Sequence, residues 1–175
     1  PSQDYAESCR EKLAEYLVFD ALIGNVDRHH ENWGILRKPL KDGRYRGRLA
    51  PTFDHASSLG RELADEGGKQ SRRRYFEELG IVKYAERATG AVYIDETSKR
   101  GPSPLNLVEG CLEPSDLSPY FRSALKKLEN LDALAIQEQV KRVPESWMSD
   151  LSRRFVADFF SYNLETLEEH ELKPR

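Results

Sequence analysis

The pattern of apolar positions predicts an amphipathic helix over the first part of the chain, from about residue 4 to residue 23. Apolar side chains recur there at intervals of three and four residues, at Leu13, Tyr16, Leu17, Ala21 and Leu22. Charged residues fill the intervening positions, which is typical of a helix with one buried and one solvent-facing side. Gly24 and Asn25 are expected to end this helix, because both tolerate the left-handed conformation found at helix C-termini.

A β-hairpin is predicted directly after this helix. Residues 33–37 and 48–53 have the character of short strands, and an Asp-Gly turn signal lies between them in residues 41–44. Antiparallel strands joined by a tight turn place their outer ends side by side. The hairpin would therefore bring Asn32 and Asp54, which flank it, close together.

The remainder of the chain is predicted to be mainly helical. In the variable segment 56–115 the periodicity is weak; residues 72–88 are expected to form two helical pieces separated at Gly80, residues 91–94 fit a helix or a strand, and residues 98–104 resemble a loop. Residues 116–128, 131–141 and 145–167 each show helical periodicity, and Pro144 suits a helix start. The last of these helices carries an apolar stripe that is expected to pack in the core: Trp147, Leu151, Phe155, Phe159 and Tyr162.

Length and composition favour a single globular domain. The chain has 175 residues, of which 33% are charged and 38% hydrophobic, enough to bury a core. Its net charge of −3 gives no overall basic surface, so direct binding of nucleic acid is not expected. The basic run Arg72–Arg74 is expected to be solvated on a surface helix.

The chain has neither a membrane-spanning pattern nor a disulfide pattern. No apolar run reaches the roughly 18 residues that a membrane span requires. The two cysteines, Cys9 and Cys111, have no metal-binding or redox spacing, and free thiols in a reducing compartment are the simplest interpretation. We therefore expect a cytoplasmic protein without a membrane partner.

The residues that suggest chemistry lie in a short motif around the predicted hairpin. Asp27 is followed five residues later by Asn32, and Asp54 comes after the hairpin. Phosphoryl-transfer enzymes use such a set: one carboxylate orients the attacking hydroxyl, and an amide and a second carboxylate supply hard oxygen ligands to Mg²⁺. The protein-kinase catalytic loop has the same interval between its Asp and its Asn, with a further metal-binding Asp downstream.

Other interpretations of these residues remain open. Asp27 and Asn32 each suit the capping of a turn. The histidines 29, 30 and 55 could instead join Asp27 and Asp54 in the metal site of a hydrolase, although no His-x-x-x-His spacing supports this. Arg28 fits a phosphate contact or an exposed ion pair equally well.

Residues 22–32, with the sequence Leu-Ile-Gly-Asn-Val-Asp-Arg-His-His-Glu-Asn, and residues 49–54, Leu-Ala-Pro-Thr-Phe-Asp, closely resemble HipA-like serine/threonine kinases. The resemblance covers residues from about 13 to 58. It implies a mainly α fold, the protein-kinase-like C-terminal lobe, with a small β-hairpin carrying the metal-binding residues. It also implies ATP and Mg²⁺ as cofactors, Asp27 as catalytic base, and Asn32 and Asp54 as Mg²⁺ ligands. His29 would support the nucleotide site from the same loop.

The resemblance divides the 175 residues into a catalytic loop (24–34), a β-hairpin (33–54), the variable segment (56–115) and C-terminal helices (116–170). Neither a glycine-rich phosphate loop nor a strand lysine stands before Asp27. The kinase N-terminal lobe is therefore expected to be missing, and the chain resembles a fragment of a longer protein. HipA-like kinases are often toxins of toxin–antitoxin pairs, which makes an antitoxin a candidate partner beside a Ser- or Thr-containing protein substrate. The alternatives are a phosphoinositide-kinase-like or small-molecule phosphotransferase, whose loop shares Asp-Arg-His-x-x-Asn, and a non-catalytic kinase-like scaffold.

Overall fold

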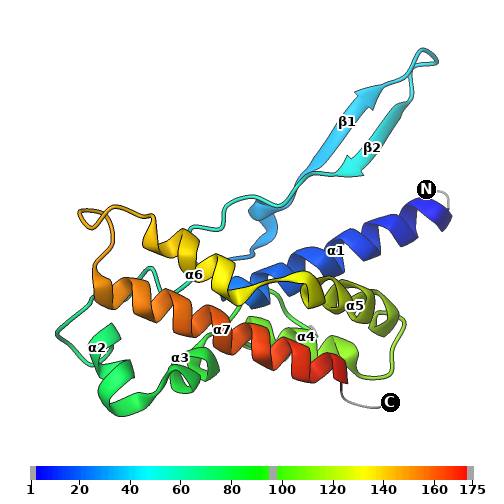
Figure 1. Cartoon of the computed structure of the whole chain (residues 1–175). Coiled ribbons are helices and arrows are strands. Elements are labelled where there is room, and N and C mark those ends of the chain that lie inside the picture. The colour runs from blue at the N-terminus through cyan, green and yellow to red at the C-terminus, as the bar shows by residue number, and fades with distance from the viewer. Residues whose placement is uncertain (1–2, 95–97, 173–175) are drawn as a thin grey trace.

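The computed structural model describes residues 3–94 and 98–172, which are mainly helical with one small antiparallel sheet (Figure 1). The α-helices are α1 (Gln3–Ile23), α2 (Arg72–Arg74), α3 (Ile81–Arg87), α4 (Pro104–Leu112), α5 (Ser118–Leu125), α6 (Ala133–Lys141) and α7 (Asp150–Leu172). Two 3₁₀ helices are η1 (His30–Asn32) and η3 (Lys126–Asn130), and η2 (Tyr75–Leu79) is a π-helical turn. The predicted mainly α class is confirmed. Within the described ranges no helix is both long and apolar enough to cross a bilayer.

Helix α1 lies at the centre of the helical body and packs against α4, α5 and α7 (Figure 1). Its extent matches the predicted helix, and its buried apolar positions are Ala14, Leu17, Val18, Ala21, Leu22 and Ile23. The expectation that Leu13 belongs to the buried face is wrong, since Leu13 is exposed.

Gly24 ends α1 as predicted. The Gly24 N–H donates to the Ala21 carbonyl at 3.2 Å, and the Asn25 N–H donates to the Asp20 carbonyl at 2.8 Å. This pair of bonds is a Schellman motif with Gly24 in the left-handed position, at φ +62°. The side chain of Asn163 on α7 donates to the Leu22 carbonyl at 3.0 Å, so the last turn of α1 is also held from α7.

The predicted hairpin is present, with its strands shifted toward the turn. Strands β1 (Ile35–Pro39) and β2 (Tyr45–Leu49) are antiparallel, with Ile35 opposite Leu49 and Pro39 opposite Tyr45. The hairpin extends away from the helices (Figure 1). Residues 50–53, expected in the second strand, lie outside it, although the Ala50 N–H still donates to the Gly34 carbonyl at 2.8 Å.

The variable segment contains one helix that the sequence did not reveal. The two pieces around Gly80 are confirmed as α2 with η2, and α3, with Gly80 at φ +82°. Residues 91–94 form neither helix nor strand. Helix α4 was missed because Pro102 and Pro104 suggested a loop. Pro104 in fact stands in the first turn, where a missing N–H costs nothing, and the Ser103 hydroxyl caps the helix.

Arg72 corrects the interpretation of the basic run. Arg73 is exposed and Arg74 partly exposed, and both pair with glutamates, as expected for a surface run. Arg72 is buried instead: its Nη1 pairs with Asp65 at 2.9 Å, and its Nη2 donates to the Gly60 carbonyl at 2.8 Å. The run therefore includes one structural residue that holds the loop after the hairpin.

The C-terminal helices are confirmed in number and order, but the last of them begins later than predicted. Helix α7 begins at Asp150, and the Ser149 hydroxyl accepts from the Ser152 N–H at 3.0 Å as its cap. Trp147 therefore lies in the turn before the helix and is 84% exposed, so its expected place in the core is wrong. Phe155 and Phe159 are fully or almost fully buried as predicted.

Candidate active site

Two loops meet at the open end of α1 and carry the predicted site residues. The first, residues 24–32, leaves α1, and the second, residues 50–59, leaves β2. Backbone hydrogen bonds join them: the Val26 N–H donates to the Ser57 carbonyl at 3.3 Å, and the Leu59 N–H donates to the Ile23 carbonyl at 2.9 Å. The segments that hold Asp27 and Asp54 are thus fixed against each other.

Arg28 ties the two loops together from inside. Its Nη1 donates at 2.9 Å both to the Asn32 carbonyl and to the Phe53 carbonyl, which directly precedes Asp54. Its Nε and Nη2 bind the two carboxylate oxygens of Asp20 at 2.7 and 2.8 Å. Only 2% of Arg28 is exposed. Both sequence interpretations of Arg28, a phosphate contact and an exposed ion pair, are therefore wrong.

Asp20 and Asn25 complete this buried network, and sequence reasoning assigned neither of them to the site. The Asn25 amide Nδ2 donates to Asp20 Oδ1 at 2.8 Å, while the Asn25 Oδ1 accepts from the Asp27 N–H at 3.2 Å. Asp20 therefore positions Asp27 through Asn25 and holds both loops through Arg28. The available signal was a single acidic residue among the apolar positions at the end of α1, since a buried carboxylate needs a partner.

Asn32 lies on η1 and is 4% exposed. Its Nδ2 donates to the Asp27 carbonyl at 2.7 Å, and because a carbonyl only accepts, this bond fixes which end of the amide is which. Among residues 3–94 and 98–172, no hydrogen bond engages the Asn32 Oδ1. The arrangement leaves a hard oxygen available, the kind of ligand that Mg²⁺ prefers.

The Asp27 carboxylate is accessible although its backbone is held on both sides. The side chain is 51% exposed, and its Oδ1 lies 3.9 Å from His29 Nε2. His29 Nδ1 accepts from the Glu31 N–H at 3.2 Å, and its Nε2 is the nitrogen on the side of Asp27. His29 thus caps η1 and borders Asp27, as a supporting residue of the loop.

Asp54 is exposed and has an unusual backbone conformation. Its φ is +56°, in the left-handed region that only glycine adopts without cost. Non-glycine residues held in that region concentrate at functional sites, where surrounding structure maintains them. The neighbouring His55 contributes here, because its Nε2 lies 3.0 Å from the Thr52 hydroxyl and its ring packs edge-on against Phe19.

These contacts do not favour the histidine metal site of a hydrolase. His55 Nε2 faces Thr52, and His29 Nδ1 is occupied by a backbone N–H. In the part of the chain that the structure describes, no three His, Cys, Asp or Glu side chains are placed to hold one metal ion. Asn32 and Asp54, with an amide and a carboxylate rather than imidazoles, stay the predicted metal ligands.

One cavity borders both loops. It measures about 280 Å³, and Val26 and Ser57 line it together with Arg61, Tyr84 and Arg87. Burial, with a hydrogen bond to Glu62, raises the pKa of the Tyr84 phenol far above its usual value. The phenol therefore stays protonated and donates to the Glu62 carboxylate at 2.5 Å.

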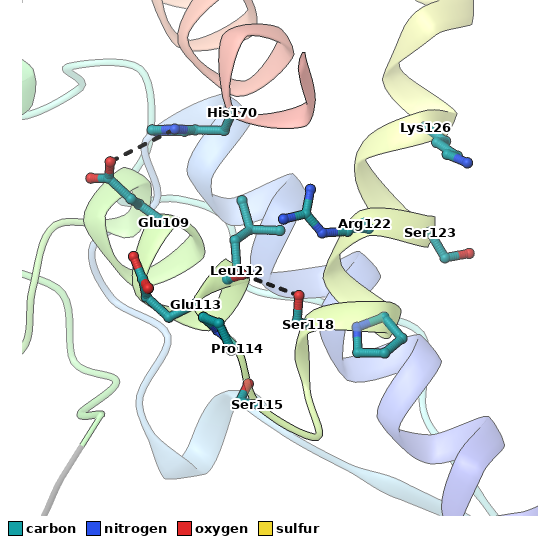
Figure 2. Close-up of a pocket in the computed structure, with 11 residues that line it drawn as sticks. Glu109, Leu112, Glu113, Pro114, Ser115, Ser118, Arg122, Ser123, Lys126 and His170 are labelled. Carbon is teal, nitrogen blue, oxygen red and sulfur yellow. Dashed lines mark hydrogen bonds and ion pairs between the residues drawn. The ribbon is translucent and has the colours of Figure 1, made fainter. Parts of the chain in front are cut away.

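A larger groove lies elsewhere, between α4, α5 and the end of α7 (Figure 2). It measures about 930 Å³. In Figure 2 the His170 ring points toward the Glu109 carboxylate, at 3.9 Å, and the Ser118 hydroxyl donates to the Leu112 carbonyl. None of the residues predicted from the sequence motif lines this groove, so its size carries no weight for the phosphoryl-transfer hypothesis.

Comparison of the chain with protein-family models, with curated proteins and with solved structures gave no match.

Proposed function

We propose that this chain is the C-terminal catalytic lobe of an ATP- and Mg²⁺-dependent serine/threonine protein kinase of the HipA-like kind. The observation that carries the proposal is the position of Arg28, whose one Nη1 binds the carbonyls of Asn32 and Phe53. That contact holds the start of the hairpin beside its end, as the metal ligands of a phosphoryl-transfer site require.

Asp27 is proposed to orient the acceptor hydroxyl and to take its proton. Its backbone is fixed through Asn25 and Asn32 while its carboxylate remains open to solvent. A general base must reach a hydroxyl with such a free carboxylate, within hydrogen-bonding distance. The fixed backbone limits where the carboxylate can point, which supports positioning of the acceptor.

Asn32 and Asp54 fit the binding of Mg²⁺. The Asn32 Oδ1 is available, and Asp54 makes no ion pair within the described residues. When bound, Mg²⁺ would neutralise charge on the phosphates of ATP. His29 would support the nucleotide site by holding the loop between Asp27 and Asn32.

The chain carries the base and the metal ligands but no clamp for ATP in the 26 residues before Asp27. We propose that an N-terminal lobe outside these 175 residues supplies it, and that the isolated chain transfers no phosphate. A protein Ser or Thr is the proposed acceptor, an antitoxin a candidate partner, and the cytoplasm the proposed location.

Metal binding can be tested on the chain itself with Mn²⁺ as a paramagnetic substitute for Mg²⁺. Nuclear magnetic resonance should show selective broadening of the amide signals around Asn32 and Asp54, reversed by excess Mg²⁺. Asp54→Ala should remove the effect, whereas Asp42→Ala, an exposed carboxylate at the hairpin turn, should keep it. Broadening that is unchanged in Asp54→Ala would exclude Asp54 as a ligand.

Catalysis requires the protein with its N-terminal lobe. There, Asp27→Asn should abolish transfer of ³²P from γ-labelled ATP to protein while the circular dichroism spectrum stays the same. Parallel assays with protein, phosphoinositide and small-molecule acceptors separate the protein kinase from the alternative phosphotransferases. A full-length protein that binds partners but transfers no phosphate would support the scaffold alternative.

A further inference from the structure

The hairpin concentrates positive charge in a chain that is acidic overall. Residues 35–49 contain six cationic side chains, at positions 37, 38, 41, 44, 46 and 48, against the single acid Asp42, a net charge of +5. Because the whole chain has a net charge of −3, the remaining residues carry −8. We call residues 35–49 the basic arm; it projects away from the helices (Figure 1).

The two faces of the basic arm differ. Side chains directly opposite in an antiparallel pair share a face, and so do residues two apart. Gly47 and Ile35 belong to the face turned toward α1, because a Cβ at Gly47 would lie 3.4 Å from the Tyr5 hydroxyl. The opposite face carries Leu36, Lys38, Arg46 and Arg48, all of them exposed.

The cations on this outer face have no acidic partner among the described residues. Arg44 pairs with Asp42 at 2.7 Å, but Lys38, Arg46 and Arg48 appear in no ion pair there. Lys38 stands directly opposite Arg46, an arrangement that destabilises a hairpin through repulsion of like charges. A bound polyanion would relieve this repulsion. Three of the four cations in the strands lie on the outer face, and Arg37, opposite Gly47, lies on the other.

The overall net charge predicts no nucleic-acid binding, but it hides the local charge of the hairpin. We propose that the basic arm binds the phosphate backbone of double-stranded DNA. The major groove of B-form DNA admits a two-stranded β-ribbon, and the arm is such a ribbon, free of covering helices along its outer face. The phosphates provide the continuous negative charge that three closely spaced cations match. The acidic remainder of the chain repels DNA, so the approach is restricted to the arm.

Fluorescence anisotropy with a labelled DNA duplex of about 20 base pairs tests the proposal. The chain should bind with a dissociation constant on the order of 10⁻⁴ to 10⁻⁶ M, and more weakly as salt rises from about 50 to about 200 mM. The triple variant Lys38→Gln, Arg46→Gln, Arg48→Gln removes three phosphate contacts. The slope of log K against log salt should therefore become shallower by about 3.

The matched control is the triple variant Lys69→Gln, Lys126→Gln, Arg142→Gln, which changes the net charge equally at exposed sites outside the arm. It should bind DNA within about twofold of the unaltered chain. Equal weakening in both variants, or no binding by the unaltered chain, would overturn the proposal. Tighter binding of single-stranded RNA or of polyglutamate than of the duplex would also overturn it.

Chemical-shift mapping gives a readout that does not depend on the variants. Addition of the duplex should shift amide signals in residues 35–49 and leave those of α4 and α7 unchanged. Shifts centred on the helical body instead of the arm would contradict the proposal. Neither measurement involves phosphoryl transfer, so the proposed kinase function and the proposed DNA contact stand or fall separately.

Discussion

Arg28 and Asp20 form a bidentate ion pair in which each residue is 2% exposed. Removal of one partner leaves the other charge buried without compensation. Arg28→Met should therefore lower the free energy of unfolding by about 3–5 kcal/mol, measured by urea denaturation followed by circular dichroism. The double variant Asp20→Leu, Arg28→Met should recover part of this loss, because no buried charge remains.

An exposed ion pair provides the control for this prediction. Arg44 and Asp42 are 2.7 Å apart at the hairpin turn, where solvent screens their attraction. Arg44→Met should leave the urea midpoint unchanged within error. If Arg28→Met has an equally small effect, the buried network does not hold the two loops together as described.

Gly24 is required at the end of α1 for two separate reasons. Its φ is +62°, and a Cβ there would lie 2.5 Å from Phe159 Cε1. Gly24→Ala should lower the free energy of unfolding by about 3 kcal/mol, since backbone strain costs about 1–2 kcal/mol and overpacking about 1–3 kcal/mol. Gly67 has φ +83° and open space around it, so Gly67→Ala should show only the backbone cost. Similar losses in both variants would contradict the predicted clash.

The sequence predicted those elements whose signals are local. The apolar period of α1, the Gly24–Asn25 stop and the Asp-Gly turn act within a few residues, and all three are confirmed. Helix α4 was missed because Pro102 and Pro104 resemble loop signals, whereas α7 was expected to begin too early because Pro144 resembles a helix start. Whether Pro104 begins a helix depends on the burial of the leucines after it, which is a tertiary property.

The same distinction applies to the candidate site. Spacing identified Asp27, Asn32 and Asp54, whose roles remain predictions. It did not identify Asp20 and Arg28, since their importance depends on burial and on contact with Phe53, 25 residues beyond Arg28. Sequence spacing does not reveal residues whose importance rests on burial and on contacts distant in the chain.

Asp54 should show a conflict between stability and function. Its left-handed backbone, at φ +56°, favours glycine. Asp54→Gly should therefore leave the free energy of unfolding unchanged or raise it by up to about 1 kcal/mol, while abolishing Mn²⁺ broadening. Asp27→Gly is the matched control, because Asp27 is not in the left-handed region: it should lose about 0.5–1 kcal/mol and keep the broadening. Destabilisation by Asp54→Gly would indicate a structural role for that carboxylate.

Asp65 connects the loop after the hairpin to α7, and its carboxylate makes the free energy of unfolding depend on pH. Its carboxylate accepts hydrogen bonds from the hydroxyls of Ser149 and Ser152 and pairs with Arg72. The bond from Ser149, with those from Ser152 and Arg72, lowers the pKa of Asp65 below its usual value near 3.8. The folded state therefore holds this proton less tightly than the unfolded state.

The stability that Asp65 contributes is fully present above about pH 4 and is lost as the pH falls through the lowered pKa of the folded state. Urea denaturation of the chain and of Asp65→Asn between about pH 2 and pH 7 should show a gap that closes at the acid end. Glu66→Gln, which alters an exposed neighbour, should give a curve parallel to that of the unaltered chain. A constant gap for Asp65→Asn across the whole range would mean that its hydrogen bonds do not depend on ionisation, contrary to the lowered pKa.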